Sequence, residues 1–249
     1  MAISDEIKQQ TVKFKNMNRQ QKIDYIWTYY KWWIIGAIIV IVSVISVINT
    51  VKDNSKPEYL GAIFLNSKNS SNSAQCTLEK EFLAAYGMEE KDYKSGFDYV
   101  TYLDDNYGNQ ASLAGQVKLV SLYSAGQLDI VTGNESVMSG PGDPGGYAKL
   151  EEILPEGMLD DLKDKGYEFY YYTEKVYEEG SVPDENGYRP YTDGETYLAG
   201  IYLDNCAKLV GNASTCVYDE GMEDRPVLTI AWNGTNIDHA IEFIKFVTE

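Results

Sequence analysis

Residues that could carry nucleophilic or metal chemistry are few in this chain. The 249 residues include one histidine, His239, and three cysteines, Cys76, Cys206 and Cys216. One histidine cannot build a His-rich zinc site, and the cysteines lack the Cys-x-x-Cys spacing of zinc and iron–sulfur sites. The G-x-S-x-G, S-x-x-K and P-loop motifs are also missing from the sequence. We therefore expect no catalytic residue, no metal and no cofactor.

Two of the cysteines leave an open question. Cys206 and Cys216 stand ten residues apart, and a disulfide between them is plausible outside the cytoplasm, although Cys76 would then be unpaired. The alternative is three buried thiols. His239 lies opposite the apolar stripe of the last helix, so we expect it to be solvated.

Carboxylates are abundant but show no catalytic pattern. The chain has 38 Asp and Glu residues, from which a hydrolase could use a pair, yet no pair stands out. The segment 104–109 is rich in oxygen ligands, but its glycine is misplaced for a calcium loop. We interpret it as a turn between a strand and a helix.

Small polar residues follow the expected strands. In an open α/β sheet, ligands bind at the carboxyl ends of the strands. This rule gives a candidate ligand site made of Asn66, Ser67, Asp104, Asp105, Gly133, Asn134 and Asn233. The tyrosine cluster at 167–172 could stack sugars or peptides, but alternate tyrosines of a hairpin packed on the core are the favoured reading.

The elements that must position these residues alternate along the chain. Apolar runs predict strands at 59–65, 97–103, 128–132, 196–203 and 227–232. Helical periodicity predicts helices at 77–87, 110–125, 150–165 and 237–247. The helix at 110–125 has an apolar stripe of Leu113, Val117 and Val120, with Ser124. This order predicts an α/β fold with a mixed, mostly parallel sheet and helices on both faces.

One apolar run stands before this domain. Residues 32–48 carry no charge over 17 residues, about 25 Å as a helix, which reaches the lower limit for a membrane span. The anchor residues are aromatic or basic and suit the interface: Tyr29, Tyr30, Lys31, Trp32 and Trp33. A cleaved signal peptide and a buried helix are the alternatives, which a long polar head and Ile/Val on all faces disfavour.

The anchor divides the chain into four parts. We expect an amphipathic cytoplasmic head at 1–31, a single transmembrane helix at 32–51, a linker at 52–57 and an extracellular domain at 58–249. Six basic residues precede the span and three follow it closely, which places the amino terminus inside. The partner of the anchor is therefore the lipid bilayer.

Charge restricts the partners of the outer part. Residues 54–249 hold 14 basic and 34 acidic side chains, a net charge of −20. Such a surface repels nucleic acid and anionic headgroups, so a nucleic-acid function is excluded. Solubility explains the acidity better than specific cation capture does.

Several segments resemble a known family. The segment 119–132, with its Gly-Gln-Leu-Asp-Ile turn and strand, is similar to extracellular solute-binding proteins of the type II periplasmic-binding fold. The strand at 197–203, the closing helix at 237–247 and the aromatic head at 24–33 resemble membrane-anchored members from Gram-positive, clostridia-like bacteria. The resemblance implies two lobes that close on a ligand. Only 167–196 could be a second lobe here, as a vestige or a hairpin insertion.

Together these features predict a binding protein and not an enzyme. We expect non-covalent recognition of a small polar ligand or a partner protein on the outer side of the membrane. The alternative is a structural subunit of a membrane complex built on a degenerate solute-binding fold. A carboxylate-based hydrolase is the third hypothesis.

Overall fold

The computed structural model describes residues 18–94, 96–104, 109–140, 143, 145–178, 180–182 and 189–249. The chain forms two compact units, Met1–Ser55 and Lys56–Glu249.

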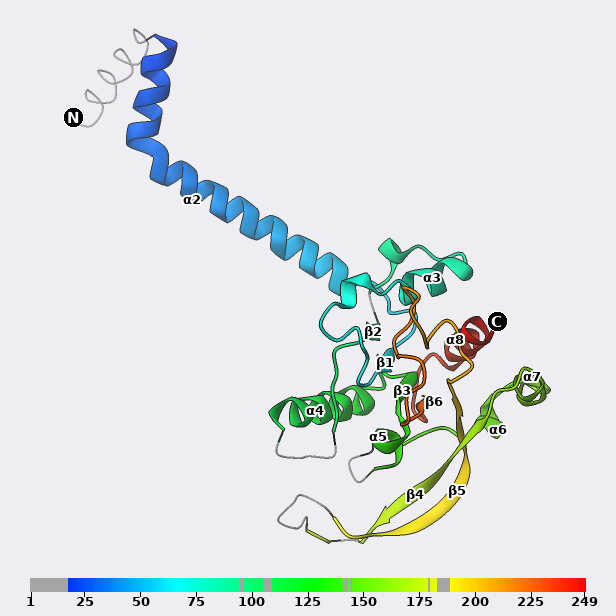
Figure 1. Ribbon diagram of the computed structural model, residues 1–249. Helices are drawn as coiled ribbons and strands as arrows, with labels where there is room; N and C mark the ends of the chain where they lie inside the picture. The colour runs from blue at the N-terminus through cyan, green and yellow to red at the C-terminus, as the bar shows by residue number, and fades with distance from the viewer. Residues whose placement is uncertain are drawn as a thin grey trace. The chain divides into compact units, whose positions relative to one another are not determined.

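The first unit contains helix α2 (Arg19–Asn54), drawn in blue in Figure 1. Within α2, the 22 residues Lys31–Lys52 have a mean hydropathy of 2.7, and none of the window is buried among the described residues. This part of α2 is long and apolar enough to cross a membrane. Trp32 and Trp33 are exposed, and the Lys31 ammonium lies 5.7 Å from the Trp32 ring centroid.

The boundaries around α2 differ from the prediction. The helix starts at Arg19, inside the expected head, and ends at Asn54, inside the expected linker. The helix therefore continues through both expected boundaries. At its carboxyl end, no glycine or proline interrupts the segment 52–54, and the first proline, Pro57, comes three residues after Asn54. Residues 1–17 and the side chains of Tyr29 and Tyr30 lie outside the described part of the chain.

The second unit is built on one six-stranded sheet. Its strands are β1 (Ala62–Phe64), β2 (Phe97–Asp98), β3 (Ile130–Asn134), β4 (Phe169–Tyr177), β5 (Tyr191–Tyr202) and β6 (Pro226–Ile230). They lie in the order β2-β1-β3-β6-β5-β4. β1 pairs in parallel with β2 and β3, whereas β3–β6, β5–β6 and β4–β5 are antiparallel.

The sheet is therefore mixed, as predicted, but mostly antiparallel, so the prediction of a mostly parallel sheet is wrong. The parallel part follows from the β-α-β-α-β order of the first three strands. The antiparallel part has two causes. β4 and β5 form a hairpin, and β6 returns to lie between β3 and β5, which are far apart in the sequence.

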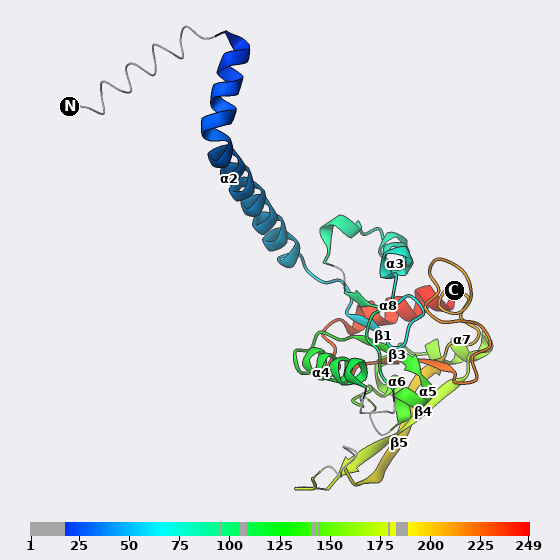
Figure 2. The same cartoon turned by 60° about the vertical axis from the view of Figure 1, so that its left-hand side comes forward.

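Helices cover both faces of the sheet, as predicted. One face packs on α3 (Leu78–Ala85), α6 (Leu150–Ile153), α7 (Met158–Asp164) and α8 (Ile237–Thr248), and it holds the larger apolar core. Figure 2 shows α3 beside α8, where Phe82 and Phe243 meet edge to face at 5.2 Å. The other face packs on α4 (Gln110–Ser124) and α5 (Glu135–Ser139).

Helix α4 buries a different face from its apolar stripe. Ser112, Gly115 and Leu119 face inward, whereas Leu113, Val117 and Val120 are 52%, 62% and 65% exposed. The cause is close packing at Gly115, where a Cβ would stand 2.3 Å from the Tyr102 carbonyl oxygen. Small residues let the helix approach the 101–103 segment, and the larger side chains are left outside.

The hairpin of β4 and β5 extends past the sheet (Figure 1). β5 pairs with β6 only at Gly200–Tyr202, whereas it pairs with β4 from Tyr191 to Ile201. The outer part is thus a two-stranded arm. The segment 192–194, Thr-Asp-Gly, has residue types that are typical of a turn, yet it lies inside β5. The segment 183–187, which also has a turn-like composition, lies outside the described residues.

The Leu-Asp-Ile segment has a structural role at the start of β3. The Asp129 carboxylate is 1% exposed and accepts hydrogen bonds from the Gly61 N–H (2.9 Å), the Asn236 N–H (2.8 Å) and Asn236 Nδ2 (3.1 Å). Asn236 precedes α8, so one carboxylate joins β1, β3 and the start of the last helix.

Candidate ligand-binding cleft

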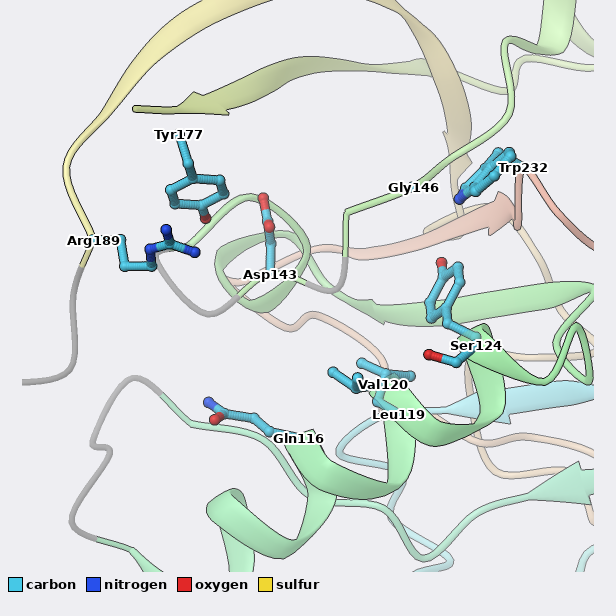
Figure 3. A pocket seen from close by; sticks show the side chains of 10 residues that line it. Gln116, Leu119, Val120, Ser124, Asp143, Gly146, Tyr177, Arg189 and Trp232 are labelled. Carbon is cyan, nitrogen blue, oxygen red and sulfur yellow. The ribbon is translucent and has the colours of Figure 1, made fainter. Parts of the chain in front are cut away.

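A cleft of about 650 Å³ opens between α4 and the hairpin arm (Figure 3). Its walls come from four separate parts of the domain. They are Gln116, Leu119, Val120, Tyr123 and Ser124 of α4, Asp143 and Gly146 of the loop between α5 and α6, Tyr177 and Arg189 of the hairpin, and Trp232 after β6. A second hollow of about 420 Å³ shares Asp143, Gly146, Tyr177 and Trp232 with it and continues under β4 and β5.

Gly146 sets the position of Trp232. The glycine has φ +63°, a conformation that L side chains rarely adopt, and a Cβ there would stand 2.7 Å from the indole ring. The Trp232 backbone N–H donates to the Gly146 carbonyl at 2.9 Å. The indole therefore lies directly over the glycine and remains 66% exposed at the cleft.

A buried ion pair lies between the loop and the arm. Lys175 Nζ stands 2.8 Å from Asp143 Oδ2, and the two side chains are 6% and 4% exposed. Lys175 also donates to the Ser139 and Gly140 carbonyls, and the Tyr172 hydroxyl donates to Asp143 Oδ2 at 3.0 Å. Burial raises the pKa of the Asp143 carboxyl, while the bond from Lys175 acts against this rise.

Tyrosines surround this pair. Burial raises the pKa values of Tyr123, Tyr147 and Tyr172, and that of Tyr197 to about 12, with the Asp143 charge adding to each rise. The Tyr197 hydroxyl donates to the Tyr147 carbonyl at 3.0 Å. The Tyr123 hydroxyl is buried and has no hydrogen-bond partner among the described residues. An unpaired buried hydroxyl costs free energy, which a ligand could recover.

The predicted site residues do not gather in the cleft. Asn66 has φ 57° and exchanges two bonds with the backbone of Leu103, at 2.8 and 2.9 Å. Ser67 donates to the Val217 carbonyl at 3.2 Å, and Asn134 donates to the Asp224 carbonyl at 3.0 Å. These three residues therefore fasten loops to the ends of β1 and β3, and the loop between β5 and β6 covers those strand ends.

The other predicted residues also have local contacts. A Cβ on Gly133 would touch Leu65 and Met138 at 3.2 Å, so the backbone there is tightly packed. The Asp104 carboxylate accepts from Asn109 Nδ2 at 2.9 Å near the start of α4, and Asp105 lies outside the described residues. Asn233 is nearest to the cleft, because its Nδ2 donates to the carbonyl of Tyr123 at 2.6 Å.

Cysteine and histidine have packing roles. Cys206 and Cys216 are free buried thiols in the structure, donating to the Val247 and Ala207 carbonyls at 3.1 and 3.5 Å. Burial raises the pKa of Cys206 to about 11, so it is no thiolate nucleophile at neutral pH. His239 is half-buried: it stacks on Tyr59 at 3.9 Å, and its Nδ1 lies 2.7 Å from the Tyr59 carbonyl. The expectation of a solvated histidine is therefore wrong.

The described residues contain no group of three or more His, Cys, Asp or Glu side chains that could hold a metal ion. The cleft instead offers hydrogen bonds, aromatic faces and one ion pair. These groups are typical of sites that bind ligands non-covalently.

Sequence reasoning missed the residues that line the cleft. The segment 140–146 is rich in Gly and Pro, a composition that indicates a loop, and Asp143 is the acid within it. Trp232 is the sole tryptophan of the sequence outside α2, and it stands two residues after the last residue of β6, Ile230. An isolated Trp at a strand end was the signal that could have indicated the site.

Comparisons of the chain with protein families, with curated proteins and with solved structures found no match.

Proposed function

We propose that this chain is a membrane-tethered protein whose acidic α/β domain binds a ligand non-covalently. The observation that carries the proposal is the cleft of about 650 Å³, in which apolar, aromatic and hydrogen-bonding side chains converge. Pockets of roughly 300–1,000 Å³ with this mixture take small organic ligands. The Tyr123 hydroxyl, which bonds to none of the described residues, adds a polar group to the cleft.

The proposal also assigns sides of the membrane. The excess of Lys and Arg before α2's apolar part supports a cytoplasmic amino terminus and an outer domain. Protease added to intact bacterial cells that express the chain should digest a tag at the carboxyl terminus and spare one at the amino terminus. The reverse pattern would refute this orientation.

A substitution that fills the cleft tests the binding function. Val120→Trp places a large ring at the cleft wall, and Val117→Trp places the same ring one helical turn earlier, outside it. A thermal-shift screen of sugars, amino acids, short peptides and polyamines should find a compound that raises the Tm of the full chain in nanodiscs. A ligand at 100 times its Kd adds about 2.7 kcal/mol of stability. Val120→Trp should abolish this rise, and Val117→Trp should retain it.

A second candidate function, a structural subunit of a membrane complex, rests on the exposed stripe of α4. Apolar side chains gathered on one helix face often mark a protein contact. Two results together would favour assembly over ligand binding. They are a thermal-shift screen without any hit, and a mass of the purified protein particle that differs between Val117→Trp and the wild type.

A carboxylate-based hydrolase has weaker support. Asp143 and Glu174 both line the smaller hollow, but Lys175 and Tyr172 already hold Asp143 Oδ2. An acid catalyst needs a carboxyl group that is free to give up a proton.

A further inference from the structure

The charges that face the cleft balance one another. Asp143 is compensated by Lys175 in a buried pair, and Arg189 and Glu174 bring opposite single charges to the two hollows. The Arg189 guanidinium lies 5.7 Å from the Tyr177 ring centroid and donates to the Ser181 carbonyl at 2.9 Å. A polyanion would meet the net charge of −20 of residues 54–249, and a cation would find Asp143 already paired. The cleft therefore suits a neutral ligand.

Flat aromatic faces stand at the two ends of the cleft. Figure 3 shows Trp232 at one end and Tyr177 with Arg189 at the other, with α4 below them. Trp232 is 66% exposed and Tyr177 is 41% exposed, so both rings have area to offer. Such rings stack on ligands that have flat apolar faces.

The polar groups of the cleft can both donate and accept hydrogen bonds. The Tyr123 hydroxyl is buried and has no partner in the described part of the chain, and Gln116 and Ser124 lie on the same helix along the cleft. Hydroxyl and amide side chains are matched by a ligand with many hydroxyls, because each hydroxyl also donates and accepts. A proline-rich peptide has carbonyl acceptors but few N–H donors, so the acceptor atoms of these side chains would stay without a hydrogen bond.

The wall formed by the hairpin is a strand face and not a strand edge. Tyr172 and Tyr197 point from paired positions of β4 and β5 into the smaller hollow. An extended peptide gains most of its affinity by adding to a free edge, where backbone groups are unpaired. In the cleft, side chains must supply the contacts.

We propose that the cleft binds a neutral oligosaccharide, with one sugar ring stacked on Trp232 and ring hydroxyls bonded to Tyr123, Gln116 and Ser124. This proposal rests on the binding function proposed above and names the class of ligand. The free volume of about 650 Å³ and the adjoining hollow under β4 and β5 suit a short chain of rings rather than a single one.

The test uses the full chain in nanodiscs on an array of neutral, acidic and amino-modified glycans, with a proline-rich decapeptide as a competing probe. We expect saturable binding of at least one neutral oligosaccharide. Replacing Trp27, Trp32 and Trp33 by Phe leaves Trp232 as the sole tryptophan, so its fluorescence reports contact at the cleft. The bound glycan should shift this emission.

Variants then locate the binding. Trp232→Ala should weaken the Kd for the bound glycan about tenfold, because it removes the stacking face. Tyr123→Phe should weaken the Kd several-fold without lowering the Tm, because the lost hydroxyl has no hydrogen-bond partner among the residues that the structure describes. The matched control is Tyr171→Ala, an aromatic of β4 that is 59% exposed and does not line the cleft. Its Kd should equal that of the wild type.

The outcomes separate the two proposals. Binding of only the decapeptide or only charged glycans, lost in Trp232→Ala, would overturn the oligosaccharide assignment and retain the cleft as a binding site. Neutral glycan binding that Trp232→Ala and Tyr123→Phe leave unchanged would also overturn the assignment. No response to any probe, with a hit from the wider screen that Val120→Trp abolishes, would overturn it as well.

Discussion

Replacing Lys175 by methionine is expected to lower the free energy of unfolding of the domain by about 3–5 kcal/mol. The ammonium of Lys175 is the charge partner of Asp143, and both side chains are almost fully buried. Methionine fills similar volume but leaves the Asp143 carboxylate buried without its partner. The loss should lower the Tm by roughly 10 °C in a domain of this size.

Denaturant unfolding of the full chain in nanodiscs, followed by circular dichroism, measures this loss. Lys149→Met is the matched control, because Lys149 pairs with Glu195 at 2.7 Å but lies at the surface. It should cost less than about 1 kcal/mol. The double variant Asp143→Asn/Lys175→Met should recover most of the stability. Equal effects of the two lysine substitutions would contradict the assigned role of burial.

Replacing Asp129 by alanine is the second large expected effect, about 3 kcal/mol of unfolding free energy. The variant removes a buried carboxylate that accepts three hydrogen bonds, from Gly61 and Asn236. Buried backbone N–H groups would be left without an acceptor, and the start of α8 would lose a negative charge that its dipole favours. Asp129→Asn should have an intermediate effect, since it keeps one acceptor oxygen.

Chemical denaturation again provides the measurement. Asp219→Ala is the control, because this carboxylate is 68% exposed and lies 3.4 Å from Lys68. It should change the stability by less than about 0.5 kcal/mol. An Asp129→Ala variant as stable as the control would show that the Asp129 contacts do not hold β1, β3 and α8 together.

The local elements could be predicted from the sequence because each has its own periodicity. The sequence of the closing helix indicates a buried stripe of Ile237, Ala240, Ile241, Ile244 and Val247. The structure buries the last four of these and leaves Ile237 partly buried. The direction of strand pairing could not be predicted in the same way. β6 pairs with β3 across more than 90 residues, and no local pattern encodes that return. The buried face of helix α4 was predicted wrongly for a different reason. The close packing of Gly115 against the Tyr102 backbone turns the apolar stripe of the helix outward.

The cleft was beyond sequence reasoning because its walls come from four distant segments. The expectation that ligands bind at the carboxyl ends of strands selected Asn66, Ser67 and Asn134. These residues would be open to a ligand if no loop covered the end of the sheet. Here the loop between β5 and β6 closes those ends through the carbonyls of Val217 and Asp224. Space for a ligand instead remains where α4 and the hairpin arm face each other.

The two walls of the cleft differ in mechanical stiffness. Helix α4 is packed along its length through Ser112, Gly115 and Leu119, whereas the outer part of the hairpin has no third strand beside it. A two-stranded ribbon is at best marginally stable by itself in water, and the register shift between Tyr170 and Tyr171 interrupts the pairing of β4 with β5 near the sheet. The contacts of Lys175 and Tyr172 with Asp143 therefore fix the arm against the loop beside it, and the width of the cleft depends on that buried pair. A ligand of the proposed binding function would thus meet one wall held by helix packing and one wall held by an ion pair.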